Sequence, residues 1–331
     1  MTLLKLSLKR GALVTAANWQ VVVVQFVADT LFKTLIAVPV VGGLVLVALV
    51  VGGNPLELLR FDDLTQTISS MVSVLLAQPV ALVAFAAALG IVVAGGSIMM
   101  FAVKAGTVTV LLAGDRSAGT IELPPLRLSA LREANQTTLE RFTNGVRNLF
   151  FRYLRLGMLL TVAYAIIGVA YLLFVFGPSM PQSFDNPLTV TLASLSVLVG
   201  ITLLNFLYLL MQIVMAAEDC GVLDAFPHVA RLVRRRTKEL GQVLAAILAL
   251  MVMATGASIL ATTQLGLISF VPFIGLAALP LQVFAWLVRG VVFQYVGLTG
   301  VSTYVRMHFA LRSAPVGVHT PTDGLRQVTR A

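Results

Sequence analysis

Charged residues are scarce in this chain, and their scarcity excludes a soluble globular protein. Only 11% of the 331 residues are charged, while 58% are hydrophobic; soluble domains have about 25% charged residues. The charges are too few to cover a water-exposed surface, and the apolar residues are too many to bury in one core. The composition therefore predicts an all-α, polytopic membrane protein.

Groups that carry chemistry are also few. Cys220 is the only cysteine, which excludes an internal disulfide and a multi-cysteine metal site. The histidines, His228, His308 and His319, are far apart in the sequence and lack the spacing of a metal-binding helix. The sequence has neither a G-x-x-x-x-G-K-[ST] phosphate loop nor a G-x-S-x-G elbow. We expect no cofactor, no metal and no catalytic residue, so an enzyme is the least favoured class.

Long uncharged runs supply the predicted membrane spans, since about 20 helical residues cross 30 Å of hydrocarbon. We predict a single membrane domain at 1–312, a helical bundle, and a disordered polar tail at 313–331. The spans are expected at about 35–51, 79–101, 156–176, 188–217, 243–265 and 270–289. Interfacial amphipathic helices are expected at about 3–30, 128–153 and 225–240.

Negative charge is the scarcer sign, with 14 Asp and Glu against 23 Lys and Arg. With the spans above, Arg60 is the only basic residue on the outer side, whereas the segment 104–155 alone has eight on the inner side. Positive residues accumulate in cytoplasmic loops. We therefore expect both termini in the cytoplasm and the protein in a bacterial cytoplasmic membrane. Without a separate basic domain, the partner of these charges is expected to be anionic phospholipid and not nucleic acid.

The most basic stretch, Ala216 to Gly241, lies between the fourth and fifth predicted spans and reads AAEDCGVLDAFPHVARLVRRRTKELG. Gly221 can end one helix in the left-handed conformation, and Asp224 can cap the next. The next helix is apolar on one face, and its other residues include a basic set that we expect to bind anionic lipid or a partner protein. This set is Arg231, Arg234, Arg235, Arg236 and Lys238.

Two acidic residues precede that helix. Glu218 and Asp219 follow the fourth span at a helix C-terminus, where the helix dipole disfavours anions. We expect arginines of the 231–238 segment, or a partner protein, to offset their charge. They therefore join the candidate partner-binding residues.

Small residues at four-residue steps indicate where helices can approach closely. Ala86, Gly90 and Ala94 form one such ladder in the second span, and Ala254 and Ser258 belong to another in the fifth. The N-terminal helix has an apolar face formed by Leu3, Leu6, Leu13, Ala17, Val21, Val24, Ala28 and Leu31.

At EDCGVLDAFPHVARLVRRRTKELG and at the closing TYVRMHF, the chain resembles a broad group of six-helix bacterial membrane proteins. They are related to the membrane domain of glycerophosphodiester phosphodiesterases. Members show an acidic-Gly-x-x-x-Ala turn before a basic amphipathic helix, and the matching residues here are Glu218, Asp219, Gly221 and Ala225. The phosphodiesterase's catalytic barrel has no counterpart, since 19 residues follow Arg312. The resemblance therefore implies a fold and not a reaction.

Two classes of function remain open. The first is a non-catalytic scaffold or accessory subunit that binds anionic lipid and a membrane or cytoplasmic partner, or a second copy of itself. The second is a carrier or channel for lipid or another apolar molecule. Transport would need polar groups within the spans, and the candidates are amides, which more often bond to neighbouring helices. These amides are Asn205, Gln212, Gln264 and Gln282.

Overall fold

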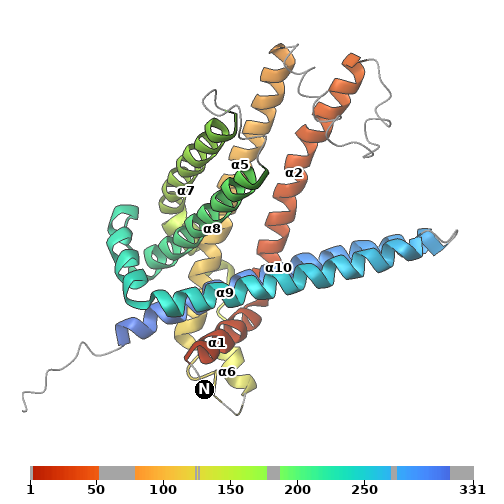
Figure 1. Cartoon of the computed structure of the whole chain (residues 1–331). Helices are drawn as coiled ribbons and strands as arrows, with labels where there is room; N and C mark the ends of the chain where they lie inside the picture. Colours follow the sequence, from red (N-terminus) through yellow and green to blue (C-terminus); the bar gives the residue numbers. More distant parts are fainter. Residues whose placement is uncertain are drawn as a thin grey trace, which may run out of the picture.

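The computed structural model describes residues 3–51, 79–123, 125, 127–176, 187–269 and 274–313. Every regular element in these ranges is a helix, and six of the helices are long and apolar enough to cross a membrane (Figure 1). The protein is thus a polytopic helical membrane protein, which confirms the predicted fold class. Residues 270–273, most of the other predicted outer segments and the predicted tail from residue 314, with His319, lie outside the described residues.

The helices extend well beyond the uncharged runs that predicted them. α5, for example, continues to Ser117 and has 39 residues, about twice the length needed to cross the hydrocarbon. Helical backbone bonding does not depend on the membrane boundary, so each helix continues into the charged region. The elements are α1 (Leu3–Ala17), α2 (Trp19–Val51), α5 (Pro79–Ser117), α6 (Leu128–Ala134), α7 (Leu139–Phe176), α8 (Pro187–Glu218), α9 (Val222–Ser269) and α10 (Ile274–Ser313).

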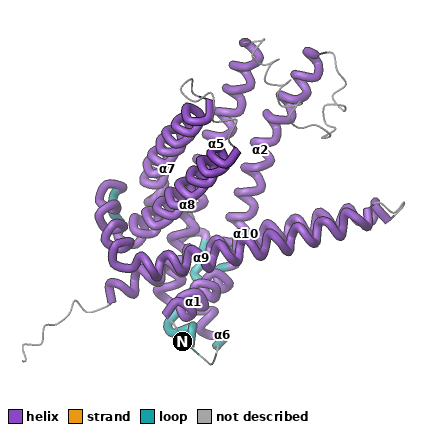
Figure 2. The backbone as a smooth tube through the Cα atoms, in the orientation of Figure 1, coloured by secondary structure: helices purple, strands orange, loops and turns teal. Residues whose placement is uncertain are grey.

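The long helices converge at one end and separate at the other. In Figures 1 and 2, α2, α5, α7 and α8 rise in one direction, while the α9–α10 hairpin leaves in another. α5 packs on α7 and α2, and α10 packs on α9 and α1. We call the converging end the head. It consists of α1, α6 and residues 105–123, 139–156, 206–243 and 298–310.

The hydrophobic core lies almost entirely in the head. Burial of each large apolar side chain away from water contributes about 1.5 to 3 kcal/mol, and these contacts hold the converging helices together. The largest fully buried side chains include Leu111, Tyr153, Leu210, Ile213, Met215, Val229 and Leu240.

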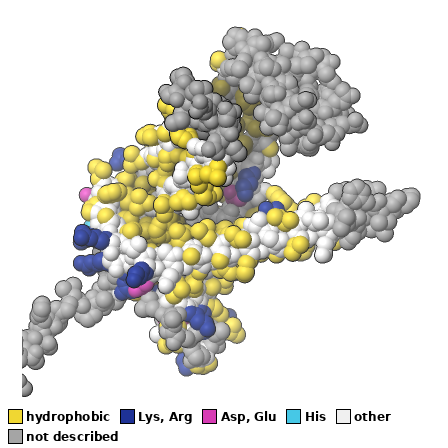
Figure 3. All heavy atoms as spheres, viewed as in Figure 1, with side chains coloured by type: hydrophobic (Ala, Val, Ile, Leu, Met, Phe, Trp, Pro, Cys, Tyr) yellow, Lys and Arg dark blue, Asp and Glu magenta, His cyan; other side chains and the backbone are white. Residues whose placement is uncertain are grey.

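Outside the head, the long helices expose their apolar side chains, and Figure 3 shows the resulting surface over α7 and α8. Such exposure is favourable in lipid, whose tails are as apolar as leucine. Examples are Val83, Ile91, Ile166, Leu195, Val252 and Phe284.

The segment 3–30, predicted as one helix, is divided at Asn18 into α1 and α2. The Asn18 side chain is fully buried and donates to the carbonyl oxygens of Val14 and Ala134, each at 2.9 Å. Its Oδ1 accepts bonds from the Gln136 backbone N–H and the Thr137 hydroxyl, each at 2.9 Å. These bonds fix the break and fasten it to the loop between α6 and α7.

The face of α1 and α2 that packs inside the protein coincides only in part with the predicted apolar face, since Val21 and Ala28 are buried. Val24 and Leu31 are 41% and 47% exposed. The buried stripe is richer in polar and small residues because apolar side chains can face lipid, whereas polar ones need partners inside the protein. It includes Ser7, Arg10, Gly11, Val14, Thr15, Asn18, Val21, Val22, Gln25 and Ala28.

Two other predicted interfacial helices also differ from the structure. The segment 128–153 contains a short helix, α6, an interruption at 135–138 and the beginning of α7. The segment 225–240 is not separate from the fifth span, because α9 runs from Val222 to Ser269 with a kink at Arg236, where φ is −134° and ψ is 34°. The kink lets the first part of α9 lie against the head while the rest enters the hairpin with α10 (Figure 1).

Candidate functional site

The first part of α9 packs one face against the other elements of the head and exposes its other face. Val229, Leu232 and Leu240 are buried in the core, and Val222 and Val233 pack against it. The opposite side exposes four of the five predicted lipid- or partner-binding cations, which we call the basic face: Arg231, Arg234, Arg235 and Lys238. Figure 3 shows dark-blue side chains gathered at this end of the molecule.

The cations of the basic face make no ion pair with any described carboxylate. Arg231 donates only to the Pro227 carbonyl oxygen one turn earlier. The fifth predicted cation, Arg236, is half-buried at the kink and pairs with Glu239. Four positive charges are therefore presented outward, and the fifth serves the fold.

Glu218 contacts two histidines, which the sequence analysis did not anticipate, and the expected interaction with arginines of the 231–238 segment or with a partner protein stays a prediction. Its carboxylate contacts His228 Nδ1 on α9, and its other oxygen lies 3.4 Å from His308 Nε2 on α10. Two histidines that are 80 residues apart in sequence thus meet at one carboxylate at the C-terminus of α8. The described residues contain no group of three or more His, Cys, Asp or Glu side chains arranged to hold a metal ion.

Asp219 pairs with Arg152 of α7, again outside the 231–238 segment. It also has the left-handed conformation that we expected at Gly221, with φ of 51°. The chain therefore leaves α8 one residue after Glu218, and the short loop carries Cys220. Burial, followed by the nearby charge of Glu218, raises the pKa of the Cys220 thiol, so this thiol stays protonated at neutral pH.

A second ionic centre, which the sequence analysis did not identify, joins α1 to α5. Arg10 is 3% exposed and donates to Asp115 Oδ1 at 2.6 Å, to the Asp115 carbonyl oxygen at 2.7 Å and to Glu122 Oε2 at 2.7 Å. It also donates to the Gly119 carbonyl oxygen. Arg306 of α10 lies 3.7 Å from Glu122 Oε1, so three separate parts of the chain meet here.

The electrostatics of this centre favour its charged form. Burial alone would lower the pKa of Arg10, but its bonds to Asp115 and Glu122 outweigh burial and raise it. For Glu122 the effect of burial has the opposite sign, since burial alone would raise the pKa of a carboxyl group. A backbone hydrogen bond, the hydrogen bond from Arg10 and the charges of Arg10 and Arg306 outweigh burial and lower the pKa of Glu122. The Arg10–Asp115 pair is buried and has two hydrogen bonds, so it holds α1 and α5 together in one geometry.

The two small-residue ladders lie in different surroundings. Ala86, Gly90 and Ala94 are exposed, and no atom lies within 4 Å of a Cβ built on Gly90. No described helix of this chain therefore packs at Gly90, and the close approach of another helix to this ladder stays a prediction. Ala254 and Ser258 line a groove between α9 and α10.

The amides in the spans also differ in their surroundings. Asn205 accepts a bond from the Tyr164 hydroxyl, and Gln212 is buried in the head. Gln282 lines the α9–α10 groove, and Gln264 is exposed near the end of α9. They do not form a common polar path among the described residues.

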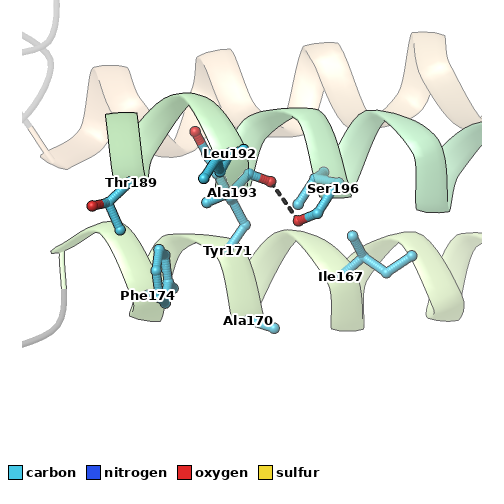
Figure 4. Close-up of a pocket in the computed structure, with 9 residues that line it drawn as sticks. Ile167, Ala170, Tyr171, Phe174, Thr189, Leu192, Ala193 and Ser196 are labelled. Carbon is cyan, nitrogen blue, oxygen red and sulfur yellow. Dashed lines mark hydrogen bonds between the residues drawn. The ribbon is translucent and has the colours of Figure 1, made fainter. Parts of the chain in front are cut away.

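Several hollows open on the surface of the described residues, and three of them lie between pairs of long helices in the predicted spans. One lies between α7 and α8, and Figure 4 shows residues of both helices lining it, with Tyr171 on the α7 side. The Tyr171 hydroxyl is 2.8 Å from Ser194 Oγ of α8, a residue that the figure does not draw. The α9–α10 groove has a volume of about 570 Å³. A more polar hollow of about 350 Å³ lies between α2 and α10, lined by Asp29, Lys33 and Arg289.

A family model matches residues 131–321, more than half of the chain. The chain belongs to this family, the Family of unknown function (DUF7544). No curated protein and no solved structure matches it. The range shared with DUF7544 contains the basic face, the contacts of Glu218 with His228 and His308, and the α9–α10 groove. It does not contain α1 and α2, so Arg10 and Lys33 lie outside it.

Proposed function

We propose that this chain is a non-catalytic membrane scaffold or accessory subunit. Its basic face binds anionic phospholipid and a partner protein at the cytoplasmic side of a bacterial inner membrane. The observation that carries this proposal is the contrast between two kinds of cation. Arg10, Arg152 and Arg236 pair with carboxylates within the head. The cations of the basic face are exposed and make no such pair among the described residues.

The orientation supports the same proposal. The basic face belongs to the head, and basic residues accumulate on the cytoplasmic side of membrane proteins. At that surface each Lys or Arg contributes about 1 kcal/mol to the attraction of anionic lipid. The relation to the phosphodiesterase membrane domain remains a proposal, and it adds a topology but no reaction.

The test compares two variants that lose the same charge. One replaces Arg231, Arg234, Arg235 and Lys238 with Gln and leaves Arg236 in place, because Arg236 pairs with Glu239. The control replaces four other exposed arginines of the head region: Arg127, Arg132, Arg147 and Arg155. Native mass spectrometry of the proteins purified in mild detergent then compares the anionic lipids and acidic partner proteins that each retains.

We expect the basic-face variant to lose most of its anionic lipid and its acidic partner, and the control variant to keep both. Equal retention by wild type and both variants would contradict the proposal. Equal loss by both variants would also contradict it, because the binding would then follow total charge and not the basic face.

The alternative function is a carrier for lipid or another apolar molecule, and the open α9–α10 groove favours it. A carrier would move lipid headgroups between leaflets, whereas a scaffold would not. Reconstitution in liposomes with a fluorescent phospholipid in one leaflet distinguishes the two. The scaffold proposal predicts the same transfer rate as for empty liposomes.

A further inference from the structure

A polar hollow and an apolar groove meet on α10. The hollow between α2 and α10 and the groove between α9 and α10 share three lining residues, Trp286, Arg289 and Phe293. Both volumes, about 350 Å³ and 570 Å³, fall within the range of about 300 to 1,000 Å³ that is typical of ligand sites. The two spaces together have one charged end and one apolar end.

The charged end holds more positive than negative charge. Lys33 and Asp29 both line the hollow, and Lys33 donates to Asp29 at 2.6 Å. Arg289 lines the same hollow and lies over the Phe293 ring at 5.6 Å, with no described carboxylate within ion-pair distance. One carboxylate therefore faces two cations in the lining, Lys33 and Arg289, which favours the binding of an anion.

The lining of the apolar end suits an acyl chain better than a polar solute. α9 contributes small side chains, including Ala254, Ala257 and Ser258, and α10 contributes Phe284 and Val288. Apart from Arg289, at the end shared with the polar hollow, no charged side chain lines this groove. It accommodates a flexible hydrocarbon that runs along the two helices.

The charged hollow lies at the boundary of the uncharged stretches, and the apolar groove lies within them, as the headgroup and acyl chains of a phospholipid require. Going inward along α10, Arg289 is the first charged residue after the uncharged stretch 240–288, and on α2 Lys33 borders the uncharged stretch 34–56. Trp286, 52% exposed, lies one turn nearer the outer end of α10, and tryptophan is enriched at membrane interfaces. The cations therefore lie at headgroup level and the groove at acyl-chain level.

The junction between the helices is fixed by close packing. A Cβ on Gly290 would lie 2.3 Å from the Phe26 ring, so α2 and α10 approach at this point as closely as a glycine allows. This contact forms the inner wall of the hollow and holds Lys33 and Arg289 on the same cavity. The site is thus part of the folded structure and does not depend on a flexible segment.

We propose that this space binds one anionic phospholipid of the leaflet beside the head. Its phosphate lies at Lys33 and Arg289, and an acyl chain lies in the α9–α10 groove. The proposal goes beyond the proposed function, because the site shares no residue with the basic face and uses α2, which lies outside the DUF7544 range. Either proposal can therefore fail without the other.

The test measures lipid binding to the delipidated full-length protein by native mass spectrometry. The probes are a synthetic phosphatidylglycerol and a phosphatidylcholine with the same acyl chains, and inorganic phosphate as the soluble anion. We expect phosphatidylglycerol to bind more tightly than phosphatidylcholine, and phosphate alone not to bind. The double variant Lys33→Gln and Arg289→Gln should lose about 30-fold in phosphatidylglycerol affinity, since two cations are removed.

The control variant Arg231→Gln with Arg234→Gln removes the same amount of charge from the basic face. It should bind phosphatidylglycerol with the wild-type affinity. Arg289→Lys keeps the positive charge and should keep most of the phosphatidylglycerol affinity. This result would show that loss of charge causes the weaker binding of the double variant. Ala257→Trp fills the groove without changing charge, and it should weaken both lipids. Thermal melting of each variant confirms that it is folded.

Several results would overturn the proposal. Equal affinity of the two lipids for wild type would exclude a headgroup site. An equal loss in the control would place the binding on the basic face. Binding of inorganic phosphate with the same affinity as the lipid would assign the site to a soluble anion. If Ala257→Trp left lipid binding unchanged but abolished a dimer, the groove would be an interface between two copies of this chain.

Discussion

Replacing Arg10 with Met tests the ionic centre that joins α1 to α5. The substitution leaves Asp115, 3% exposed, and Glu122, with a 12% exposed side chain, without their main partner. Removal of one member of a buried ion pair costs about 3 to 5 kcal/mol, since the remaining charge is uncompensated. We therefore expect a loss of this size in the free energy of unfolding.

The assay is unfolding in mixed micelles of mild detergent and SDS, followed by circular dichroism. The matched control is Arg152→Met, which breaks the pair with Asp219, whose side chain is 82% exposed. A surface pair contributes about 0 to 1 kcal/mol, so this variant should stay close to wild type.

A third variant separates the charge from the packing. Arg10→Met combined with Asp115→Leu and Glu122→Gln removes the uncompensated charges and should recover part of the lost stability. If Arg10→Met cost no more than Arg152→Met, the centre would not hold the head together, and the reasoning would be refuted.

Three further predictions concern the head. Asn18→Ala should cost about 1 to 3 kcal/mol, because it leaves buried backbone groups of the α6–α7 loop without partners; the micelle assay measures it, and a change below 0.5 kcal/mol would contradict it. Gly11→Ala places a Cβ 2.3 Å from Thr303 Oγ1 and 2.9 Å from the Thr299 carbonyl oxygen, so it should lower the free energy of unfolding by about 1 to 3 kcal/mol. The control Gly90→Ala adds a Cβ in open space and should be neutral or stabilising. Because the pKa of Glu122 is lowered in the folded protein, its ionised carboxylate contributes to the free energy of unfolding above the ordinary pKa of about 4.3, and this contribution is lost as the pH falls through the lower folded value. Glu122→Gln should therefore flatten the decline of melting temperature in acid. An unchanged decline would exclude this role.

The sequence predicted the membrane class and six long apolar helices because both depend on composition and on uninterrupted uncharged runs. Helix ends were less predictable. α5 continues to Ser117 because nothing in its sequence ends a helix where the hydrocarbon ends. The break at Asn18 depends on bonds to residues 134–137, more than 115 positions away, and no local pattern encodes that contact.

The candidate site was predictable where it depends on local charge and not where it depends on tertiary contact. The cations of the basic face follow from one stretch of sequence. The contacts of Glu218 with His228 and His308 join three helices, and the pairing of Arg10 with Asp115 joins residues 105 apart. The buried stripe of α1 was missed because a water-based reading takes the apolar face as the inner one, whereas in lipid that face can point outward.

The orientation of the head is the central claim, because the proposed binding of cytoplasmic partners by the basic face depends on it. Accessibility of single cysteines tests it directly, in a background where Cys220→Ser removes the one native thiol. Leu128→Cys reports on the head, where Leu128 is 84% exposed, and Ser183→Cys reports on the segment 177–186, outside the described residues. A membrane-impermeant maleimide should label Ser183→Cys in intact cells and Leu128→Cys only after permeabilisation. Labelling of Leu128→Cys in intact cells would place the head outside and contradict the account.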